Sequence, residues 1–203
     1  MANTQVERNI QPFGYSEMYE WAHTPIEQKY GLFVQFSSND PDKIEPSHEY
    51  DPVIAGVSTI CAVAESDNPS EWKNKWACNE VGDIFMEKET LAVGNKVYDQ
   101  HLEMAYIQTR PWDHYIKIKN KEFDDSLKYI PRTSRKEWTR VTIVGKAIVI
   151  DDGSCTPGQF CRPYSGIDML KAGHAVPAEP DYNGSKYYVL DRVTDKSITI
   201  VMK

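Results

Sequence analysis

The sequence predicts a mainly β domain of the barrel or sandwich-like kind, built from short strands with one or two small helices. Three observations predict this class. The chain contains 5 Trp, 12 Tyr and 6 Phe, and many of these aromatics stand in β-like contexts. Runs rich in Val, Ile and Thr recur along the chain and are longest at residues 139–150. Turn residues such as Asn39, Asp40 and Pro41 separate these runs.

Two runs in the first third of the chain have the pattern of strands. From residue 32 onward, Leu32, Val34 and Phe36 alternate with the residues between them, which predicts a strand with one buried face. Residues 53–60 are apolar and rich in β-branched side chains, which is typical of a buried strand. We therefore expect the first strand to be half-buried and the second to be buried.

The middle third of the chain differs from the rest. Residues 67–70 combine a potential N-cap with Pro and Ser, which predicts a short helix that presents Trp72 and Trp76 on one face at i,i+4 spacing. Residues 83–128 mix short strands with charged loops. We expect these two tryptophans, and Trp112, to pack in the core rather than to form a ligand platform.

The last third is predicted to be β throughout. Residues 139–150 form a strand that ends in a hairpin-type turn at 151–154. One helical turn is predicted within residues 166–173. Alternation at 187–190 and 197–201 predicts a terminal pair of strands.

Composition and charge exclude several classes of protein. The 23 Lys+Arg and 30 Asp+Glu give a net charge of −7, and without a basic block this argues against nucleic-acid or anionic-membrane partners. No apolar run approaches the ~20 residues of a membrane span, and the first residues lack the apolar part of a secretory signal. The 4 cysteines are too few for a disulfide framework. Cys155 and Cys161 could bridge across a Pro-Gly turn, but two buried thiols are favoured.

No motif for metal or cofactor chemistry is present. The chain has no GxGxxG, and Lys146 lacks the upstream glycine of a phosphate-binding loop. The 5 histidines are scattered and form no HExxH pattern. We therefore expect no metal site and no evident cofactor, and the absence of GxSxG leaves no signal for a serine nucleophile.

The strongest candidate for chemistry is the carboxylate pair Glu17 and Glu20. The two residues lie beside Ser16 in a segment flanked by Tyr19 and Trp21. Two close carboxylates tend to share one proton, so such a pair can supply one general base and one general acid. Spacing alone favours the simpler interpretation, which is a solvated acidic stretch beside a strand.

Five segments, in order along the chain, resemble segments of one protein family. They are residues 15–21 (an "EMFEW"-like opening), 31–34 (a first strand), 54–58 ("ILGVVS"), 129–138 ("YIPR…PEW") and 144–161 ("GKV…DDGTC…GDYC"). The family is the intramolecular-chaperone autoproteolytic domain at the C-terminus of phage tail spikes and preneck appendage proteins, classed with the glutamic peptidases. The likeness covers residues 15–203, although 61–128 aligns poorly and residues 22–25 depart from the family's "DGNP"-like turn.

The resemblance implies a role in assembly. Residues 1–14 would be an extended lead-in left from an upstream spike, and residues 15–203 the chaperone domain. Such domains help a homotrimeric spike or fibre to fold and then release themselves in a single self-cleavage. The expected partners are further copies of the chain and its own upstream segment, and the expected location is the virion after synthesis in the host cytoplasm. The family is also linked with nucleotide dependence, which no residue here supports or excludes.

The resemblance also assigns the residues of the reaction. The scissile bond would be Ser16–Glu17, with Glu17 and Glu20 as the catalytic acids. Glu20 is the better general base because it lies outside the scissile peptide, and Glu17 would protonate the leaving amine or act as a charge partner. A neighbouring copy would complete the site at a threefold interface, which ties cutting to assembly.

Two alternatives stay open at this point. If the broken bond were Tyr15–Ser16, the Ser16 hydroxyl would attack the preceding carbonyl in an N→O shift. If nothing is cut, the domain is a non-enzymatic trimeric cap or an adhesin tip of a virion fibre. Its Tyr and Trp side chains would then contact a glycan or another virion protein.

Overall fold

The computed structural model describes residues 14–23, 29–48, 53–60, 62–67, 69–94, 96–99, 104–107 and 109–203. The chain divides into two compact units. One unit combines the part before residue 69 with residues 130–203, and the other consists of residues 69–129. The predicted lead-in at residues 1–14 lies outside the described residues except for Gly14.

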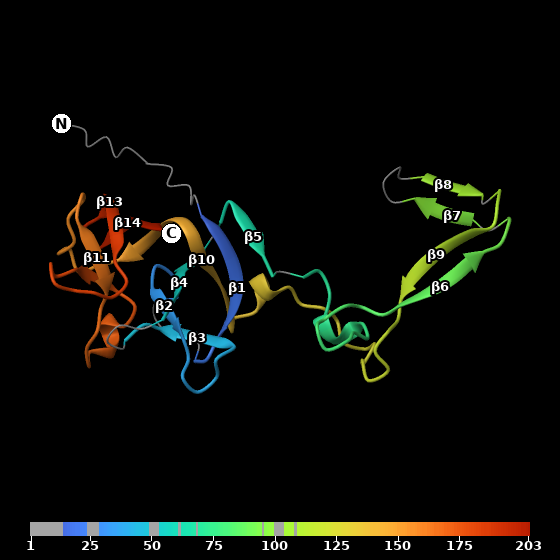
Figure 1. The fold of residues 1–203 in the computed structure, drawn as a ribbon, viewed down its shortest axis with the longest axis horizontal. Helices are drawn as coiled ribbons and strands as arrows, with labels where there is room; N and C mark the ends of the chain where they lie inside the picture. The colour runs from blue at the N-terminus through green and yellow to red at the C-terminus, as the bar shows by residue number, and fades with distance from the viewer. Residues whose placement is uncertain are drawn as a thin grey trace. The chain divides into compact units, whose positions relative to one another are not determined.

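Both units consist mainly of short strands (Figure 1). The elements of the first unit are β1 (Tyr15–Trp21), β2 (Phe33–Phe36), β3 (Lys43–Pro46), β4 (Ile54–Thr59), β5 (Ala64–Ser66), η2 (Arg132–Ser134), β10 (Trp138–Ile150), β11 (Phe160–Pro163), η3 (Met169–Lys171), β12 (Ala175–Pro177), β13 (Tyr187–Thr194) and β14 (Ser197–Met202). Those of the second unit are η1 (Lys73–Lys75), β6 (Met86–Leu91), β7 (Lys96–Asp99), β8 (Met104–Ile107) and β9 (Trp112–Lys117). The predicted mainly β fold is confirmed. The helices of the described chain are short 3₁₀ turns, and none of them is long and apolar enough to cross a membrane.

Five strands of the first unit close into a small barrel. β10 pairs with β4, β4 with β2, β2 with β3, β3 with β1, and β1 pairs back onto β10. Closure leaves these strands without an open edge along most of their length. β5 pairs in parallel with the start of β1, on the side where β3 pairs with the end of β1.

The long strand β10 belongs to both sheets of the first unit. Its first half pairs with β1 and β4, and its second half pairs with β14. From there β14 pairs with β13, β13 with β11, and β11 with β12. Gly145 stands where the partner changes and has a φ of +101°, a conformation that glycine adopts at little cost. β10 therefore passes from the barrel into the second sheet at this residue.

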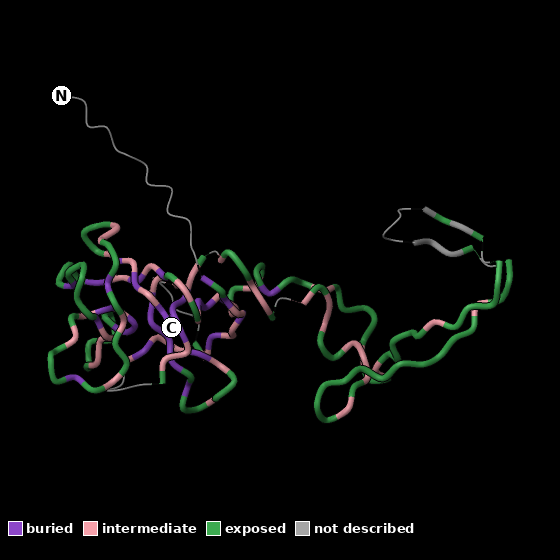
Figure 2. Tube along the Cα trace, turned by 45° about the horizontal axis from the view of Figure 1, so that its top comes forward, coloured by how far each residue is buried: buried purple, intermediate pink, exposed green. Residues whose placement is uncertain are grey.

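Two buried clusters form the core of the first unit (Figure 2). The larger cluster consists of Phe33, Val57, Ala147, Val149, Cys155, Cys161, Ala175, Val189, Ile198, Ile200 and Met202. The smaller cluster consists of Trp21, Val34, Ile44 and Val141. Strands from both ends of the sequence meet in each cluster, so the N-terminal strands cannot pack without β10.

Strand β2 is buried on both faces, which differs from the half-buried strand predicted for it. Its neighbouring residues Phe33 and Val34 belong to different clusters and are both fully buried. Phe36, which the alternation places among the buried residues, is 39% exposed. The prediction of one buried face is wrong because β2 has a buried cluster on each side, so both faces of the strand are covered.

The second unit contains a two-stranded ribbon with little burial. β6 and β9 pair in antiparallel fashion, and almost every residue of both strands is exposed (Figure 2). Trp112 was predicted to be a core residue but is 49% exposed, and Tyr115 is 64% exposed. The core prediction fails because a two-stranded ribbon has no second layer on which a side chain can pack.

The predicted helix with Trp72 and Trp76 on one face is reduced to the three-residue turn η1. The two tryptophans are the residues on either side of this turn, so they do not share a helical face. Trp72 packs edge-on against Tyr129, with ring centroids 5.2 Å apart. The Trp76 indole N–H donates to Glu71 at 2.5 Å. Trp72 and Trp76 are therefore held by separate contacts and not by packing of a shared helical face.

The predictions for the last third are confirmed except for the hairpin. β13 and β14 form the terminal strand pair, and η3 is the expected helical turn. The residues after the turn at 151–154 do not pair with β10, because β14 occupies that edge. Cys155 and Cys161 are buried free thiols, as favoured. A hydrogen bond with Cys155 and burial raise the pKa of the Cys161 thiol.

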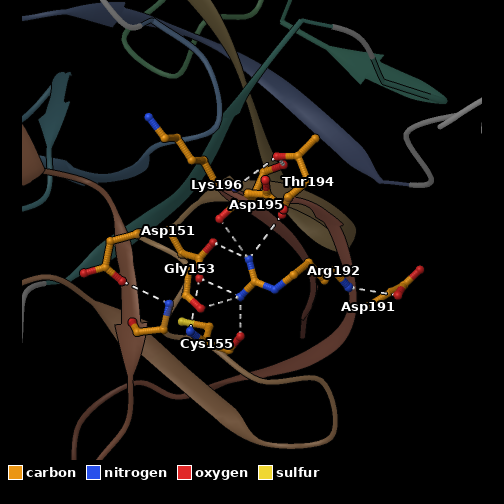
Figure 3. A network of polar contacts seen from close by, with 11 residues as sticks. Asp151, Gly153, Cys155, Asp191, Arg192, Thr194, Asp195 and Lys196 are labelled. Atoms are coloured by element: carbon orange, nitrogen blue, oxygen red, sulfur yellow. Dashed lines mark hydrogen bonds and ion pairs between the residues drawn. The ribbon is translucent and has the colours of Figure 1, made fainter. Parts of the chain in front are cut away.

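Arg192 fastens the turn that follows β10 (Figure 3). Its guanidinium donates to both carboxylate oxygens of Asp151, at 3.2 and 3.0 Å. It also donates to the carbonyl oxygens of Gly153 and Thr194, each at 3.2 Å, and to that of Cys155. The Asp151 side chain is fully buried, so solvent does not reach the carboxylate of this ion pair. This network replaces the predicted hairpin as the device that holds the turn.

Candidate active site

The predicted cleavage segment is an internal strand of the barrel. β1 covers residues Tyr15–Trp21, and the side chains of Ser16 and Met18 are buried while Glu17 is half-buried. Successive side chains of a strand point to opposite faces of the sheet. Glu17 and Glu20 are three positions apart, so their carboxylates point to opposite faces of β1.

The Glu17 carboxylate is held by two tyrosines on its own face of β1. The Tyr15 hydroxyl donates to Oε1 at 3.3 Å, and the Tyr19 hydroxyl donates to Oε2 at 3.1 Å. Burial and the hydrogen bond to Glu17 raise the pKa of Tyr19 to about 12. The Tyr19 phenol therefore stays protonated at neutral pH and keeps its proton directed at the carboxylate.

The Glu20 carboxylate is held by a lysine on the other face. Lys43 Nζ lies 3.0 Å from Glu20 Oε1 and 3.5 Å from Asp40 Oδ2. The hydrogen bond to Glu20 raises the pKa of Lys43. The Glu20 side chain is 33% exposed, so a water molecule or a group from another chain has access to it.

Within one chain, the structure does not bring the two predicted catalytic carboxylates together. Glu17 and Glu20 have different partners on opposite sides of the sheet. No group of three or more metal-ligating side chains forms in the part of the chain that is described. The assignment of Glu17 and Glu20 as catalytic residues remains a prediction. For both carboxylates to act on one bond, either one of them comes from another copy of the chain or β1 changes its conformation.

The Ser16–Glu17 peptide lies between two neighbouring strands. On one side, Ser16 pairs with Thr142 of β10, and on the other it pairs with Glu65 of β5. Ser16 is fully buried, and its hydroxyl lies 3.1 Å from the Thr142 hydroxyl. The predicted scissile bond is therefore protected by secondary structure as well as by burial.

Sequence reasoning missed the residues that tie β5 to the barrel. Glu65 forms an ion pair with Arg140 of β10, and the Ser66 hydroxyl accepts a 2.6 Å hydrogen bond from Tyr15. Glu65 and Arg140 are 75 positions apart in the sequence. No local pattern links such distant residues, so only the folded chain reveals that they flank the candidate bond.

Arg132 is the first residue of the 3₁₀ turn η2, and its side chain is buried. The structure pairs it with Asp67 of the same chain, through the side chain and through the Asp67 carbonyl at 2.6 Å. Its guanidinium lies 3.7 Å from the centre of the Trp138 ring, a cation–π distance. The Arg132 side chain is only 8% exposed, so it holds the chain just after β5.

The fold and the candidate site define a β-barrel domain that keeps its own predicted cleavage segment as an internal strand. A family model described as "Peptidase_G2, IMC autoproteolytic cleavage domain" matches residues 3–191. The chain therefore belongs to the Peptidase_G2 family of intramolecular-chaperone autoproteolytic domains. The identification made from the sequence is confirmed, and with it the self-cleaving chaperone class of the domain.

Individual relatives come from bacteriophages. The chain is 27% identical over 128 residues to the preneck appendage protein of Bacillus phage PZA and 25% identical over 125 residues to that of Bacillus phage phi29. These matches cover 63% and 62% of this chain but 13% of each relative. The chain thus corresponds to a small part of those proteins.

Two solved structures share the fold. The crystal structure of the pre-mature bacteriophage phi29 gene product 12 matches 96% of this chain and 22% of its own length, with a TM-score of 0.69 and 19% identity. The C-terminal fragment of the same gene product matches 93% of this chain and 99% of its own length, with a TM-score of 0.63 and 20% identity. At this level of identity the likeness establishes the fold.

Proposed function

We propose that this domain assists the assembly of a phage appendage or tail fibre as a homotrimer and then cuts itself free at Ser16–Glu17. One observation carries the proposal: in a chain of the autoproteolytic family, Ser16, Glu17 and Glu20 lie in one strand, β1, the first strand of the described chain. The matched relatives are preneck appendage proteins, which supports an appendage or fibre of a virion as the upstream partner.

The proposed reaction is hydrolysis of one peptide bond. A water molecule gives up a proton to the Glu20 carboxylate while its oxygen bonds to the Ser16 carbonyl carbon. The C–N bond to Glu17 then breaks, and the leaving nitrogen takes up the proton that Glu20 received, which restores the Glu20 carboxylate. The products are a chain that ends in the Ser16 carboxylate and a domain that begins with the Glu17 amine. Each domain performs this reaction once.

Association of copies supplies the second carboxylate in this proposal. Glu17 and Glu20 of one chain face opposite sides of β1, so the proposal brings Glu20 of a neighbouring copy to the Glu17 side of the bond. The exposed Trp112 and Tyr115 of the β6–β9 ribbon support association as well, because a ribbon of two strands is only marginally stable by itself. Cutting would then depend on assembly, since the site is incomplete in a single chain.

The position of the new N-terminus tests the proposal. The 203-residue chain is purified and incubated, and its products are analysed by intact mass and N-terminal sequencing. Hydrolysis at the proposed bond gives a domain that begins at Glu17. A domain that begins at Ser16 would instead indicate the N→O shift, and a chain that stays whole while trimeric would indicate a non-enzymatic cap.

A further inference from the structure

The candidate scissile peptide is held flat by strands on both sides. Tyr15, Ser16 and Glu17 pair with β10 in antiparallel fashion and with β5 in parallel fashion. The C=O and N–H of one peptide in a strand point to opposite neighbours, so the Ser16–Glu17 peptide has one group toward each strand. Hydrolysis must convert this planar unit into a tetrahedral one. At least one neighbouring strand has to release the peptide before the bond can be cut.

The two neighbours differ greatly in how easily they can leave. β10 is 13 residues long and also pairs with β4 and β14, so its departure would open the barrel and the second sheet together. β5 is 3 residues long and stands at the end of the sheet with β1 as its neighbour. Short segments at a sheet edge open locally at a much smaller free-energy cost than the core does. β5 is therefore the strand whose departure can free the bond.

Four side-chain contacts hold β5 and the residues on either side of it. Arg140 of β10 forms an ion pair with Glu65, and the same arginine donates to the Ile60 carbonyl at 2.9 Å. The Tyr15 hydroxyl donates to Ser66 at 2.6 Å. Just after β5, Asp67 is held by the buried Arg132. The contacts of Arg140 and Arg132 touch neither the Glu17 nor the Glu20 carboxylate, whereas the Tyr15 hydroxyl that contacts Ser66 also lies 3.3 Å from Glu17 Oε1.

The segment also carries backbone strain. Asp67 has a φ of +55°, and among the described residues it is the one non-glycine residue with a positive φ. L-residues adopt this conformation at a cost, because Cβ approaches the carbonyl oxygen. Asp67 is held in this conformation by its ion pair with the buried Arg132.

We infer that residues 62–67, which we call the β5 strap, form a latch that holds the Ser16–Glu17 bond in its uncut state and must open for self-cleavage. This inference rests on the proposed function, since it concerns the regulation of the same bond. Residues that hold the β5 strap then act opposite to catalytic residues. Weakening them speeds the cut, whereas removal of a catalytic group slows it.

The test compares cleavage rates of the full chain. Glu65→Gln weakens the ion pair with Arg140, and Ser66→Ala removes the contact with Tyr15. The matched control is Glu179→Gln, which weakens a comparable ion pair with Arg162, at 2.8 Å, away from β1. We expect Glu65→Gln to cut about tenfold faster than the parent, the effect of weakening one charge-assisted contact. Ser66→Ala should be faster by a smaller factor, and Glu179→Gln should match the parent.

Hydrogen exchange separates a failure of this inference from a failure of the proposed function. Exchange at the backbone amides of β5 (Ala64–Ser66) is measured in a Glu20→Gln background, with Glu65→Gln, with Glu179→Gln and with neither. Faster exchange with Glu65→Gln but not with Glu179→Gln supports the latch, even if the parent is never cut at Ser16–Glu17 and the proposed function falls. Unchanged exchange overturns the latch, and so does a Glu65→Gln chain that cuts no faster than a parent that is itself cut at Ser16–Glu17.

Discussion

Replacement of Glu20 by glutamine is expected to slow self-cleavage by about 10²–10⁴-fold, the usual contribution of a general base. Glutamine keeps the size of the side chain and its ability to accept a hydrogen bond from Lys43. It cannot take a proton from the attacking water. The rate is measured by the appearance of the domain that begins at Glu17, and circular dichroism checks that the variant is folded.

Asp40→Asn is the matched control for Glu20→Gln. Asp40 is the second carboxylate beside Lys43, with the two atoms 3.5 Å apart, but it lies outside β1. If the rate depends only on the charge around Lys43, both variants will be slow. If Glu20 is the base, Asp40→Asn will cut at the parent rate. A Glu20→Gln variant that cuts as fast as the parent would remove Glu20 from the reaction.

Replacement of Arg192 by methionine is expected to destabilise the first unit by about 3–5 kcal/mol, the cost of leaving a buried charge without its partner. The Asp151 side chain has no exposed surface, and methionine offers it no hydrogen bond. The substitution also leaves the carbonyl oxygens of Gly153 and Thr194 without a donor they now have. The free energy of unfolding from urea titration is the measurement.

Arg162→Met provides the comparison for Arg192→Met. Arg162 makes a two-point ion pair with Glu179 at 2.8 and 2.8 Å, so the geometry is similar. The Glu179 side chain is 52% exposed, and water can therefore replace the arginine. Exposed pairs contribute about 1 kcal/mol at most. Similar losses in the two variants would contradict the view that burial of Asp151 makes the Arg192 network important.

Local sequence patterns predicted where several strands lie along the chain. The β-branched run of β4 and the terminal pair β13–β14 follow directly from composition and alternation. Barrel closure could not be predicted in this way, because β1 pairs with β10 across more than a hundred residues of sequence. For the same reason the second cluster beside β2 was missed, and Phe36 was assigned to the wrong environment.

The candidate site was only partly readable from the sequence. The resemblance supplied Ser16, Glu17 and Glu20, but it did not place them on a strand. Once residues 15–21 are recognised as a strand, the three-residue spacing puts the two carboxylates on opposite faces. The partners of the β5 strap had no sequence signal, because Arg140 and Arg132 reach it only in the folded chain.

Mixing two inactive variants tests most directly whether carboxylates from different copies build the site. Glu17→Gln and Glu20→Gln chains are refolded alone and together, and the products are identified by N-terminal sequencing. The account predicts that Glu20→Gln chains stay whole alone but are cut in the mixture, releasing a domain that begins Glu17-Met18-Tyr19. If the unsubstituted chain is cut while Glu20→Gln chains remain whole in mixed assemblies, the account is wrong.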